Sequence, residues 1–296
     1  MQRILVLGGT GMLGHKLVQV LGRNFDVFAV IRAPFEEVAG FGIFDEDRTI
    51  ANVDVTDINN LKKVIRRVEP DVVINAVGMI KQIAVGAADV GMMQFLNASL
   101  PVKLAEMSVE LDFRLISIST DCVFSGRKGN YSESDRPDAD DIYGTSKLAG
   151  EVLSQENCLT LRTSIVGREL RSSHSLIEWF LSRKNGQAAG YVNAIYSGFP
   201  TVVFADILGM IIADHPELSG LYHVASKPIS KFDLLKIVDR AYGANTVLLP
   251  DPTVSIDRSL DAGKFNEATG FFPEPWEKMI ERMANDPTPY DQIGKA

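Results

Sequence analysis

The sequence predicts an α/β fold, in which a doubly wound parallel sheet is followed by a smaller C-terminal lobe. Short runs rich in β-branched residues alternate with longer helical patterns through the first half of the 296-residue chain. Strands that are separated by helices imply a parallel sheet covered on both faces. The regular alternation weakens after about residue 165, which indicates a second, smaller unit.

Each predicted strand of the first half is a short apolar run, and each is followed by a stretch with helical periodicity. The expected strands are RILVLG (3–8), DVFAVIR (26–32), DVVINAV (71–77), RLISIST (114–120) and LTLRTSIVG (159–167). The expected helices run from Gly11 to about Gly22, from near Ile58 to Val68, around Phe95 to Leu111, and through Tyr143.

The second half is less regular, and its tail from Pro250 onward is rich in Pro and Asp. We expect residues 1–165 to form a nucleotide domain, to which about 198–226 return, and 166–296 to form mainly a substrate lobe. The segment GLYHVAS is expected to return as a strand of the main sheet. The expected elements are helices at 175–186, 204–215 and 231–243, an irregular stretch at 191–201, a strand at 220–226 and an amphipathic segment at 276–283.

Composition excludes several classes of protein. The net charge of -8 and the absence of a Lys/Arg cluster argue against nucleic-acid binding. No apolar run approaches the roughly 20 residues that span a bilayer, so we expect no membrane association. Two cysteines are too few for a disulfide framework, which favours a reduced, cytoplasmic setting. A homodimer is compatible with the sequence.

A glycine-rich turn, VLGGTGMLG, directly follows the first strand and opens a helix. Gly8 allows a sharp turn, Gly11 allows close approach of a pyrophosphate, and Gly14 allows the helix to pack near the strand. The helix N-terminus offers free N–H groups to phosphates. The alternative is a tight connection without a ligand, but strand, turn and helix stand in the order of a Rossmann-type dinucleotide fold. The expected coenzyme contacts in this turn are Gly8, Thr10, Gly11, Met12, Leu13 and Gly14.

The end of the second strand carries Arg32, where a dinucleotide fold usually has an acid for the ribose 2′-hydroxyl. A guanidinium there pairs with a 2′-phosphate, which favours NADPH and leaves NADH open. The alternative is a solvated arginine at a strand end. Asp54 could accept a hydrogen bond from the adenine amino group; the alternative is that this stretch only caps the next helix through Thr56 or Asp57. We also assign Val55, Ala76, Val77 and Gly78 to the coenzyme site.

Tyr143 and Lys147 stand four residues apart in a predicted helix, and side chains at this spacing lie on one face. They could handle a proton together, or share the face by chance, since the chain has seven tyrosines. The spacing alone does not decide between these interpretations.

Taken in order, the segments GGTGMLG, DVVINAVG, ISTDCVFSGRKGNYSESDRPDADDIYGTSKLAGE, LRTSIVG and GFPTVVFADI decide the question. Together they resemble the extended short-chain dehydrogenase/reductase family, and more narrowly the dTDP-4-dehydrorhamnose reductases. The resemblance implies an NAD(P)H-dependent oxidoreductase with Thr120, Tyr143 and Lys147 as catalytic residues and Asp121 in contact with the sugar. Lys147 would also hold the nicotinamide ribose.

The substrate implied by the resemblance is a nucleoside-diphosphate-linked 6-deoxy-4-ketohexose, a precursor for surface polysaccharides, whose 4-keto group is reduced. The second lobe is then a sugar-nucleotide substrate lobe. Candidate cations for the diphosphate are Lys81, Arg162, Arg168 and Arg258, of which Lys81 and Arg258 are the ones we assign to the substrate site; each could instead be a surface ion pair.

The sequence departs from the family pattern at two places that face the sugar. Cys122 replaces an aromatic residue of the usual STDYVF, and the loop after the third strand lacks the His-Thr-Ala-Val-Asp run of the rhamnose enzymes. The substrate could therefore be another 4-ketosugar, such as a UDP-linked 2-acetamido-2,6-dideoxyhexose. We interpret Cys122 as a packed thiol without a histidine partner. The four histidines show no metal-ligand spacing, so we expect no metal site.

Two other functions stay open at this point. An epimerase that keeps its cofactor tightly bound shares the fold, but such enzymes usually carry NAD and an acid at the position of Arg32. A non-catalytic, NADP-binding regulatory subunit also shares the fold, and the fold does not exclude it. The intact set of Thr120, Tyr143 and Lys147 favours the reductase.

Overall fold

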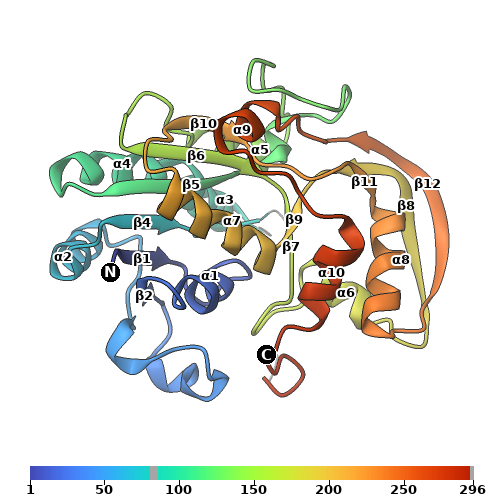
Figure 1. Ribbon diagram of the computed structural model, residues 1–296, viewed down its shortest axis with the longest axis horizontal. Helices are drawn as coiled ribbons and strands as arrows, with labels where there is room; N and C mark the ends of the chain where they lie inside the picture. Colours follow the sequence, from blue (N-terminus) through green and yellow to red (C-terminus); the bar gives the residue numbers. More distant parts are fainter. Residues whose placement is uncertain (81–85, 294–296) are drawn as a thin grey trace. The chain divides into compact units, whose positions relative to one another are not determined.

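The computed structural model describes residues 1–80 and 86–293 (Figure 1). The chain divides into two compact units. Unit 1 consists of Met1–Ser119, Asp140–Leu161 and Leu208–Leu221, and unit 2 consists of Thr120–Ala139, Arg162–Ile207 and Tyr222–Ala296.

The main sheet has seven strands in the order β10-β6-β5-β4-β1-β2-β3, and the pairs β1–β2, β1–β4, β2–β3 and β4–β5 are parallel. The order reverses direction after β1, which is the doubly wound arrangement that the alternating pattern predicts. This confirms the predicted α/β, Rossmann-type fold class. The strands are β1 (Arg3–Leu7), β2 (Asp26–Val30), β3 (Thr49–Ile50), β4 (Val72–Asn75), β5 (Arg114–Thr120), β6 (Cys158–Thr163) and β10 (Gly220–His223).

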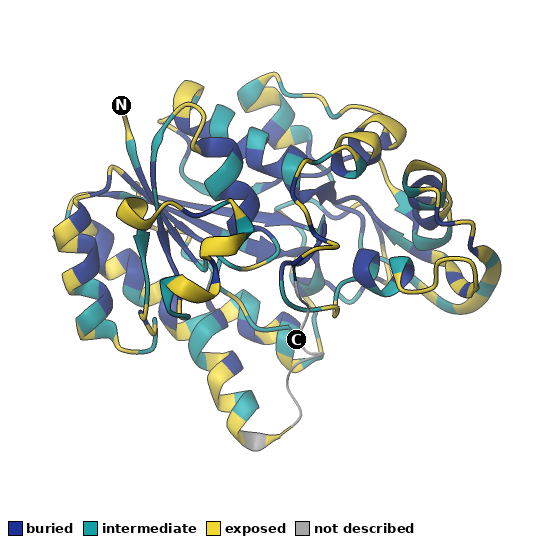
Figure 2. Ribbon diagram, turned by 90° about the horizontal axis from the view of Figure 1, so that it is seen from below, coloured by how far each residue is buried: buried dark blue, intermediate teal, exposed yellow. Residues whose placement is uncertain are grey.

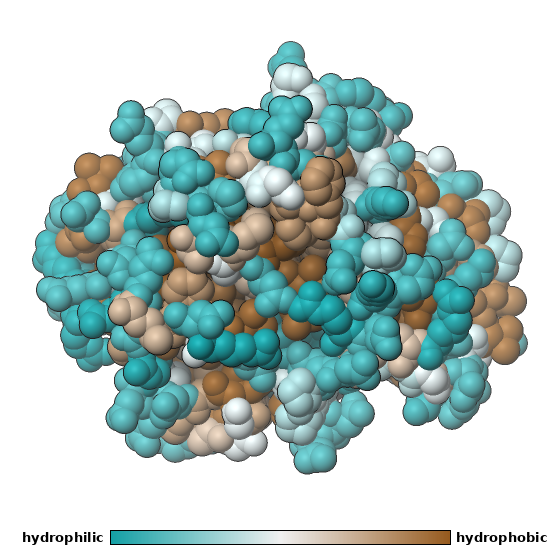
Figure 3. All heavy atoms as spheres, in the orientation of Figure 1, coloured by the Kyte–Doolittle hydropathy of each residue, from teal (hydrophilic) through white to brown (hydrophobic). Residues whose placement is uncertain are grey.

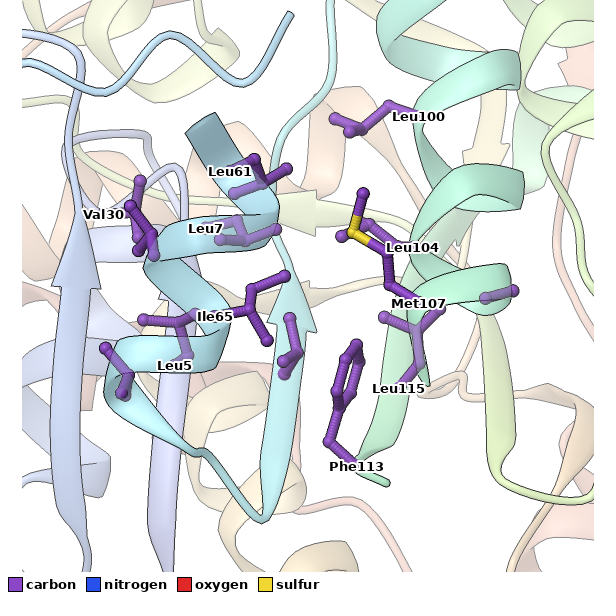
Figure 4. Packing of buried hydrophobic residues seen from close by; sticks show 14 of the residues in the cluster. Leu5, Leu7, Val30, Leu61, Ile65, Leu100, Leu104, Met107, Phe113 and Leu115 are labelled. Carbon is purple, nitrogen blue, oxygen red and sulfur yellow. The ribbon is translucent and has the colours of Figure 1, made fainter. Parts of the chain in front are cut away.

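Helices of unit 1 bury one face against this sheet and leave the other face in water, as the burial pattern in Figure 2 shows. The core beneath α2 and α4 is made of aliphatic side chains with Phe113 at its edge (Figure 4). These helices are α1 (Gly14–Leu21), α2 (Ile58–Val68), α3 (Ala87–Gln94), α4 (Leu100–Glu110) and α5 (Ile142–Ala149). Helix α7 (Thr201–Asp214) belongs to unit 2 up to Ile207 and to unit 1 from Leu208 onward. Three 3-10 turns lie between β2 and β3, η1 (Phe35–Glu37), η2 (Ala39–Phe41) and η3 (Glu46–Arg48).

Two helix predictions for unit 1 need correction. The first helix begins at Gly14 and not at Gly11, because the residues between them form the turn that follows β1. The helix expected around Phe95 begins at Ala87, and a π-helical segment, η4 (Phe95–Ser99), separates α3 from α4. A π-helical segment of this kind often marks a functional position.

Unit 2 contains a three-stranded sheet in the order β11-β8-β12 and a two-stranded sheet of β7 and β9. Strand β8 pairs parallel with β12 and antiparallel with β11, and α8 packs on β8. The strands are β7 (Ile165–Val166), β8 (Gln187–Tyr196), β9 (Phe199–Pro200), β11 (Ile229–Ser230) and β12 (Val247–Asp257). The helices are α6 (Leu176–Leu181), α8 (Lys231–Tyr242), α9 (Gly263–Thr269) and α10 (Trp276–Ala284), with a 3-10 turn, η5 (Asp121–Val123).

The stretch expected to be irregular at 191–201 lies largely in β8 and β9, so this prediction was wrong. In the tail from Pro250, residues 250–257 belong to β12, and the expected amphipathic segment at 276–283 lies in α10. The buried positions of β8 include Ala188, Gly190 and Ala194, which are too small to give a visible apolar alternation. Strand β12 contains Pro250 and Pro252, and it lies at the edge of its sheet, where proline is tolerated.

The segment GLYHVAS forms β10, which joins the main sheet beside β6 as expected. Hydrophilic side chains predominate over the face of the molecule in Figure 3, in keeping with a chain of 23% charged residues. Within the described part of the chain, no helix has the length and apolar character needed to cross a bilayer.

Candidate active site

The glycine-rich turn of unit 1 has the geometry of a phosphate-binding loop. Gly8 adopts a φ of +82°, and its carbonyl accepts a hydrogen bond of 2.9 Å from the N–H of Gly11. A Cβ on Gly14 would lie 2.0 Å from the Gly8 oxygen, so only glycine fits at the start of α1. Thr10, Met12 and Leu13 occupy the turn between β1 and α1, where we predicted coenzyme contacts. The turn thus brings main chain close to α1, where a pyrophosphate would bind.

The end of β4 lies beside this turn. A Cβ on Gly8 would lie 3.1 Å from Cγ2 of Val77 and 3.3 Å from the carbonyl carbon of Ala76. The side chain of Asn75 accepts a hydrogen bond of 3.2 Å from the Val77 N–H, which fixes how the chain leaves the strand. The structure therefore brings Ala76 and Val77 together with the predicted phosphate loop.

Arg32 and Asp54 come from separate segments that run side by side, since the N–H of Val53 donates to the carbonyl of Ile31 at 3.1 Å. Both side chains are exposed. Hydrogen bonds from the backbone and hydroxyl of Thr56 lower the pKa of Asp54, and the charge of Arg32 adds to this effect. Asp54 is thus an ionised acceptor, and Val55 follows it directly.

Helix α5 presents Tyr143 and Lys147. Its first turn is capped by Asp141, whose carboxylate accepts a hydrogen bond of 2.8 Å from the N–H of Gly144. The ammonium of Lys147 donates to the carbonyl oxygen of Ile118 at 2.6 Å. Burial lowers the pKa of Lys147 to about 8, against the opposing charge of Glu151. Lys147 is therefore fixed beside β5, two residues before Thr120.

Asn97, in the π-helical segment, is a residue of this site that our sequence analysis missed. Its amide donates 2.9 Å to the carbonyl of Met79 and 3.1 Å to the hydroxyl of Ser146, and its oxygen accepts from the Met79 N–H at 3.0 Å. Ser146 in turn donates to the carbonyl of Tyr143 at 2.9 Å. Asn97 thereby links the loop after β4 to helix α5. In the sequence, the only indication of this role is an asparagine within the otherwise apolar segment FLNASL.

Gly78, which we assigned to the coenzyme, lies in the same loop. A Cβ there would lie 3.4 Å from the Oδ1 atom of Asn97. Gly150 packs still more closely, since its Cβ would lie 2.0 Å from the Asn97 carbonyl oxygen. Close packing at both glycines holds Asn97 in place.

Unit 2 begins with Thr120 and Asp121, and both are buried. The Thr120 hydroxyl donates to the Asp121 carboxylate at 3.1 Å and accepts from the Cys122 N–H at 3.1 Å. Burial raises the pKa of Asp121, and the positive charge of Arg258 opposes the shift. Asp121 is therefore a desolvated carboxylate that a cation partly stabilises.

Arg258 follows β12 and is half-buried. Its Nε donates to the carbonyl of Phe124 at 2.8 Å, and its backbone N–H donates to that of Ile195 at 3.1 Å. The positive charge of Arg258 thus acts on Asp121 within unit 2. Burial also raises the pKa of Cys122 to about 12, which fits a packed thiol and not a nucleophile.

Two other candidate cations are engaged elsewhere in unit 2. Arg162 is buried, 3.2 Å from Nε2 of His223, and Arg168 is buried with Glu178 at 2.7 Å. These contacts argue against a role for either in binding a diphosphate. Lys81 lies outside the described residues. Arg127, which we did not predict, lines an open hollow of about 620 Å³ together with Asn193 and Asp257.

In residues 1–80 and 86–293, no group of three or more His, Cys, Asp or Glu side chains is placed to hold a metal ion.

Comparisons with known proteins identify the family of this chain. Residues 1–288 match the model of the RmlD substrate binding domain. The chain is 26% identical to the dTDP-4-dehydrorhamnose reductase of Aggregatibacter actinomycetemcomitans, over 96% of this chain and 98% of that protein.

Solved structures show the same fold. A dTDP-4-dehydrorhamnose reductase from Bacillus anthracis in complex with NADP superposes with a TM-score of 0.77 at 23% identity, covering 96% of this chain and 98% of that one. The Bordetella bronchiseptica enzyme WbmG in complex with NAD and UDP gives a TM-score of 0.74 at 18% identity, covering 95% and 92%. Since the family model spans nearly all of the sequence, the resemblance is confirmed, and the chain belongs to the RmlD substrate binding domain family.

Proposed function

We propose that this chain is an NADPH-dependent reductase of the 4-keto group of a nucleoside-diphosphate-linked 6-deoxy-4-ketohexose, acting in the synthesis of precursors for surface polysaccharides. One observation carries the proposal. Tyr143 and Lys147 share helix α5, and Lys147 is desolvated and anchored to the backbone of β5 two residues before Thr120. Tyrosine with a neighbouring ammonium is the pair that a carbonyl reduction needs.

The coenzyme fits the residues of unit 1. A Cβ on Gly14 would lie 2.0 Å from the Gly8 carbonyl oxygen, so the turn requires glycine at the start of α1. Gly8, Thr10, Gly11, Met12, Leu13 and Gly14 would hold the pyrophosphate, and Asp54, Val55, Ala76, Val77 and Gly78 would line the rest of the coenzyme site. Bound NADPH supplies a hydride to the carbonyl carbon.

Hydride addition leaves a negative charge on the carbonyl oxygen, and the chain must supply a proton to it. Tyr143 donates its phenolic proton to this oxygen, while the Lys147 ammonium stabilises the phenolate that remains. An opposite charge a few ångströms away can shift a pKa by about 3 units in a partly screened site. The resemblance assigns Thr120 a hydrogen bond to the same oxygen and Asp121 a contact with the sugar.

NADPH is proposed over NADH because of Arg32, which is exposed beside Asp54 at the end of β2. A guanidinium suits a 2′-phosphate, and the carboxylate expected for a 2′-hydroxyl is absent from that position. The Bacillus anthracis relative binds NADP, whereas WbmG binds NAD. Arg32 supports the first of these two coenzymes for this chain.

The relatives named for dTDP-4-dehydrorhamnose support a dTDP-linked substrate. Cys122, which replaces an aromatic residue, supports a UDP-linked 2-acetamido-2,6-dideoxyhexose as the second candidate. Arg258 and, outside the described residues, Lys81 are proposed to meet the sugar nucleotide. We also propose residues 1–165, with about 198–226, as the coenzyme domain, and a cytoplasmic location, which two free cysteines support.

The test is a panel of dTDP-, UDP- and GDP-linked 4-ketosugars mixed with NADPH, with loss of NADPH absorbance and the reduced sugar both measured. We expect one mole of NADPH oxidised per mole of sugar reduced. Inversion of the sugar without net NADPH oxidation would identify an epimerase instead. Tight NADP binding without turnover of any member of the panel would identify a regulatory subunit.

A further inference from the structure

Two buried polar side-chain atoms of unit 2 have no hydrogen-bond partner among the described residues, the Tyr196 hydroxyl oxygen and Oδ1 of Asn266. The hydroxyl of Tyr196, at the end of β8, is buried, and no hydrogen-bond partner for it is found among the described residues. The side chain is only 6% exposed, and its ring packs against Trp276 with the ring centres 5.5 Å apart. A buried hydroxyl without a partner has lost its hydrogen bonds to water, so the fold keeps this group at a cost to its stability.

The surroundings of Tyr196 within unit 2 are charged. The negative charge of Asp121 acts on the phenol, and together with burial it raises the pKa of Tyr196 well above the usual range. Tyr196 therefore stays protonated and is a hydrogen-bond donor. Arg258 is next to it across the sheet, because the Arg258 N–H donates to the carbonyl of Ile195.

Asp121 is the hydrogen-bond acceptor among the groups near Tyr196. Its pKa is raised by burial, while the charges of Arg258 and Lys231 act in the opposite direction. Arg258 and Lys231 are half-buried, whereas Asp121 and Tyr196 are buried. A donor, Tyr196, and an acceptor, Asp121, are thus placed together beside two positive charges.

We infer that Tyr196 and Asp121 form a subsite in unit 2 that recognises one ring hydroxyl of the hexose, with Tyr196 as a specificity-determining residue. A sugar hydroxyl accepts one hydrogen bond and donates another, which matches a phenol and a carboxylate. A site of this kind rejects an analogue that lacks the hydroxyl, because its own buried groups are then left unpaired. The inference rests on the proposed function for the choice of a hexose as ligand.

The test measures binding, so that it does not depend on turnover. Isothermal titration with dTDP, UDP and GDP, and with a hexose conjugate of each, gives the affinity added by the sugar. We expect Tyr196→Phe to weaken binding of the hexose conjugate about tenfold and to leave binding of the nucleoside diphosphate unchanged. Tyr191→Phe is the matched control, since Tyr191 lies on the same strand, is exposed, and should change neither affinity.

Thermal unfolding without ligand separates this role from a structural one. Removing an unpartnered hydroxyl should leave the unfolding temperature of Tyr196→Phe unchanged or raise it. A lower unfolding temperature would show that the hydroxyl already has a partner in the free protein, and it would overturn the inference. Equal loss of affinity for conjugate and nucleoside diphosphate, or no loss for either, would overturn it as well.

The inference and the proposed function can fail separately. If the wild-type chain binds a hexose conjugate through Tyr196 but reduces no ketosugar, the subsite stands and the reductase does not. If it reduces a ketosugar and Tyr196→Phe has the same affinity for sugar as the wild type, the reductase stands and the subsite does not. A wild-type chain that binds no conjugate more tightly than the bare nucleoside diphosphate also overturns the subsite.

Discussion

The polar groups around Tyr143 in unit 1 differ from those around Asp121 in unit 2 in how the protein satisfies them. In unit 1, Lys147 donates to the backbone of Ile118, and Asn97 has partners on both Met79 and Ser146. In unit 2, the buried Tyr196 hydroxyl has no partner within the described residues. Polar groups that already have hydrogen-bond partners are fixed in one orientation. A buried donor or acceptor without a partner can instead form its hydrogen bond with a ligand.

The difference holds for these residues and not for every buried group, since the Ser117 hydroxyl of unit 1 also has no hydrogen-bond partner among the described residues. For the residues compared, it suggests a division of work. A coenzyme has the same structure in every turnover, so its site and the proton donor can be fixed in advance by internal hydrogen bonds. A sugar site must distinguish between similar ligands, and unpaired buried groups provide that discrimination. The predictions below test each side of this comparison.

The largest expected effect concerns Tyr143. Tyr143→Phe removes the proposed proton donor but keeps the ring, so ketosugar reduction should fall by about 10²–10⁴-fold. Coenzyme affinity, measured by NADPH fluorescence, should stay within a factor of two or so, because the other unit 1 contacts remain. An unchanged rate of NADPH oxidation would rule out Tyr143 as the proton donor, and with it the proposal that helix α5 of unit 1 supplies the proton.

A second prediction separates the two units by binding. Gly14→Ala places a Cβ where the Gly8 oxygen lies, 2.0 Å away, so the phosphate loop must move. NADPH affinity should fall about 100-fold, in line with the loss of charge-assisted hydrogen bonds worth about 1.5–3 kcal/mol. Affinity for the sugar nucleotide, which we assign to unit 2, should not change.

Gly40→Ala is the control for this change, because a Cβ there meets no atom within 4 Å. It should bind NADPH as the wild type does. Equal effects of the two substitutions would mean that the loop geometry at Gly14 is not what matters.

The third prediction concerns the internal pairing of unit 1. Asn97→Ala breaks the links to Met79 and Ser146, and it removes the partner of the half-buried Met79 carbonyl and N–H. We expect a loss of stability of about 1–3 kcal/mol and a fall in kcat of about tenfold, with a smaller change in the KM for NADPH. A loss of stability without any change in kcat would restrict Asn97 to a structural role.

Asn59→Ala provides the comparison, since Asn59 is an exposed residue of α2. Its stability should remain within about 0.5 kcal/mol of the wild type. If Asn59→Ala lost as much stability as Asn97→Ala, the loss at Asn97 could not be assigned to its hydrogen bonds.

The two units also differ in how far the sequence predicts them. Strand β5 was predicted residue by residue, and the glycine turn was recognisable because Gly8 and Gly14 are required by the backbone itself. In unit 2, β8 buries Ala188 and Gly190, and β12 carries Pro250, so neither strand shows the pattern that identifies a strand. Apolar periodicity reports large buried side chains, and it fails where small residues or an edge position replace them.

The candidate site follows the same rule. Residues whose type is dictated by chemistry, such as Tyr143 and Lys147, could be named from their spacing and from the family resemblance. Asn97 and Tyr196 could not, because their importance lies in which groups they do or do not contact. Such contacts depend on segments that are distant in sequence, and only the folded structure gives them.

The smallest predicted effect is the dependence of activity on pH, and it follows from the burial of Lys147. Its pKa is about 8, below the ordinary value of 10.5, so the folded chain loses this proton as the pH rises through about 8. Loss of the ammonium removes the positive charge that we propose to stabilise the Tyr143 phenolate. The kcat/KM for the ketosugar, which reports groups of the free enzyme, should therefore fall above pH 8.

Lys147→Arg should move this decline to higher pH at a lower maximal rate, because a guanidinium keeps its charge throughout the range. The sign of the stability effect gives an independent check. Between about 8 and 10.5 the unfolded chain binds this proton and the folded chain does not, so the contribution of Lys147 to the free energy of unfolding rises with pH. Lys147→Met should remove that rise. If the decline in kcat/KM stays at the same pH in Lys147→Arg, another group controls it, and the desolvated ammonium is not the origin of the reactivity of unit 1.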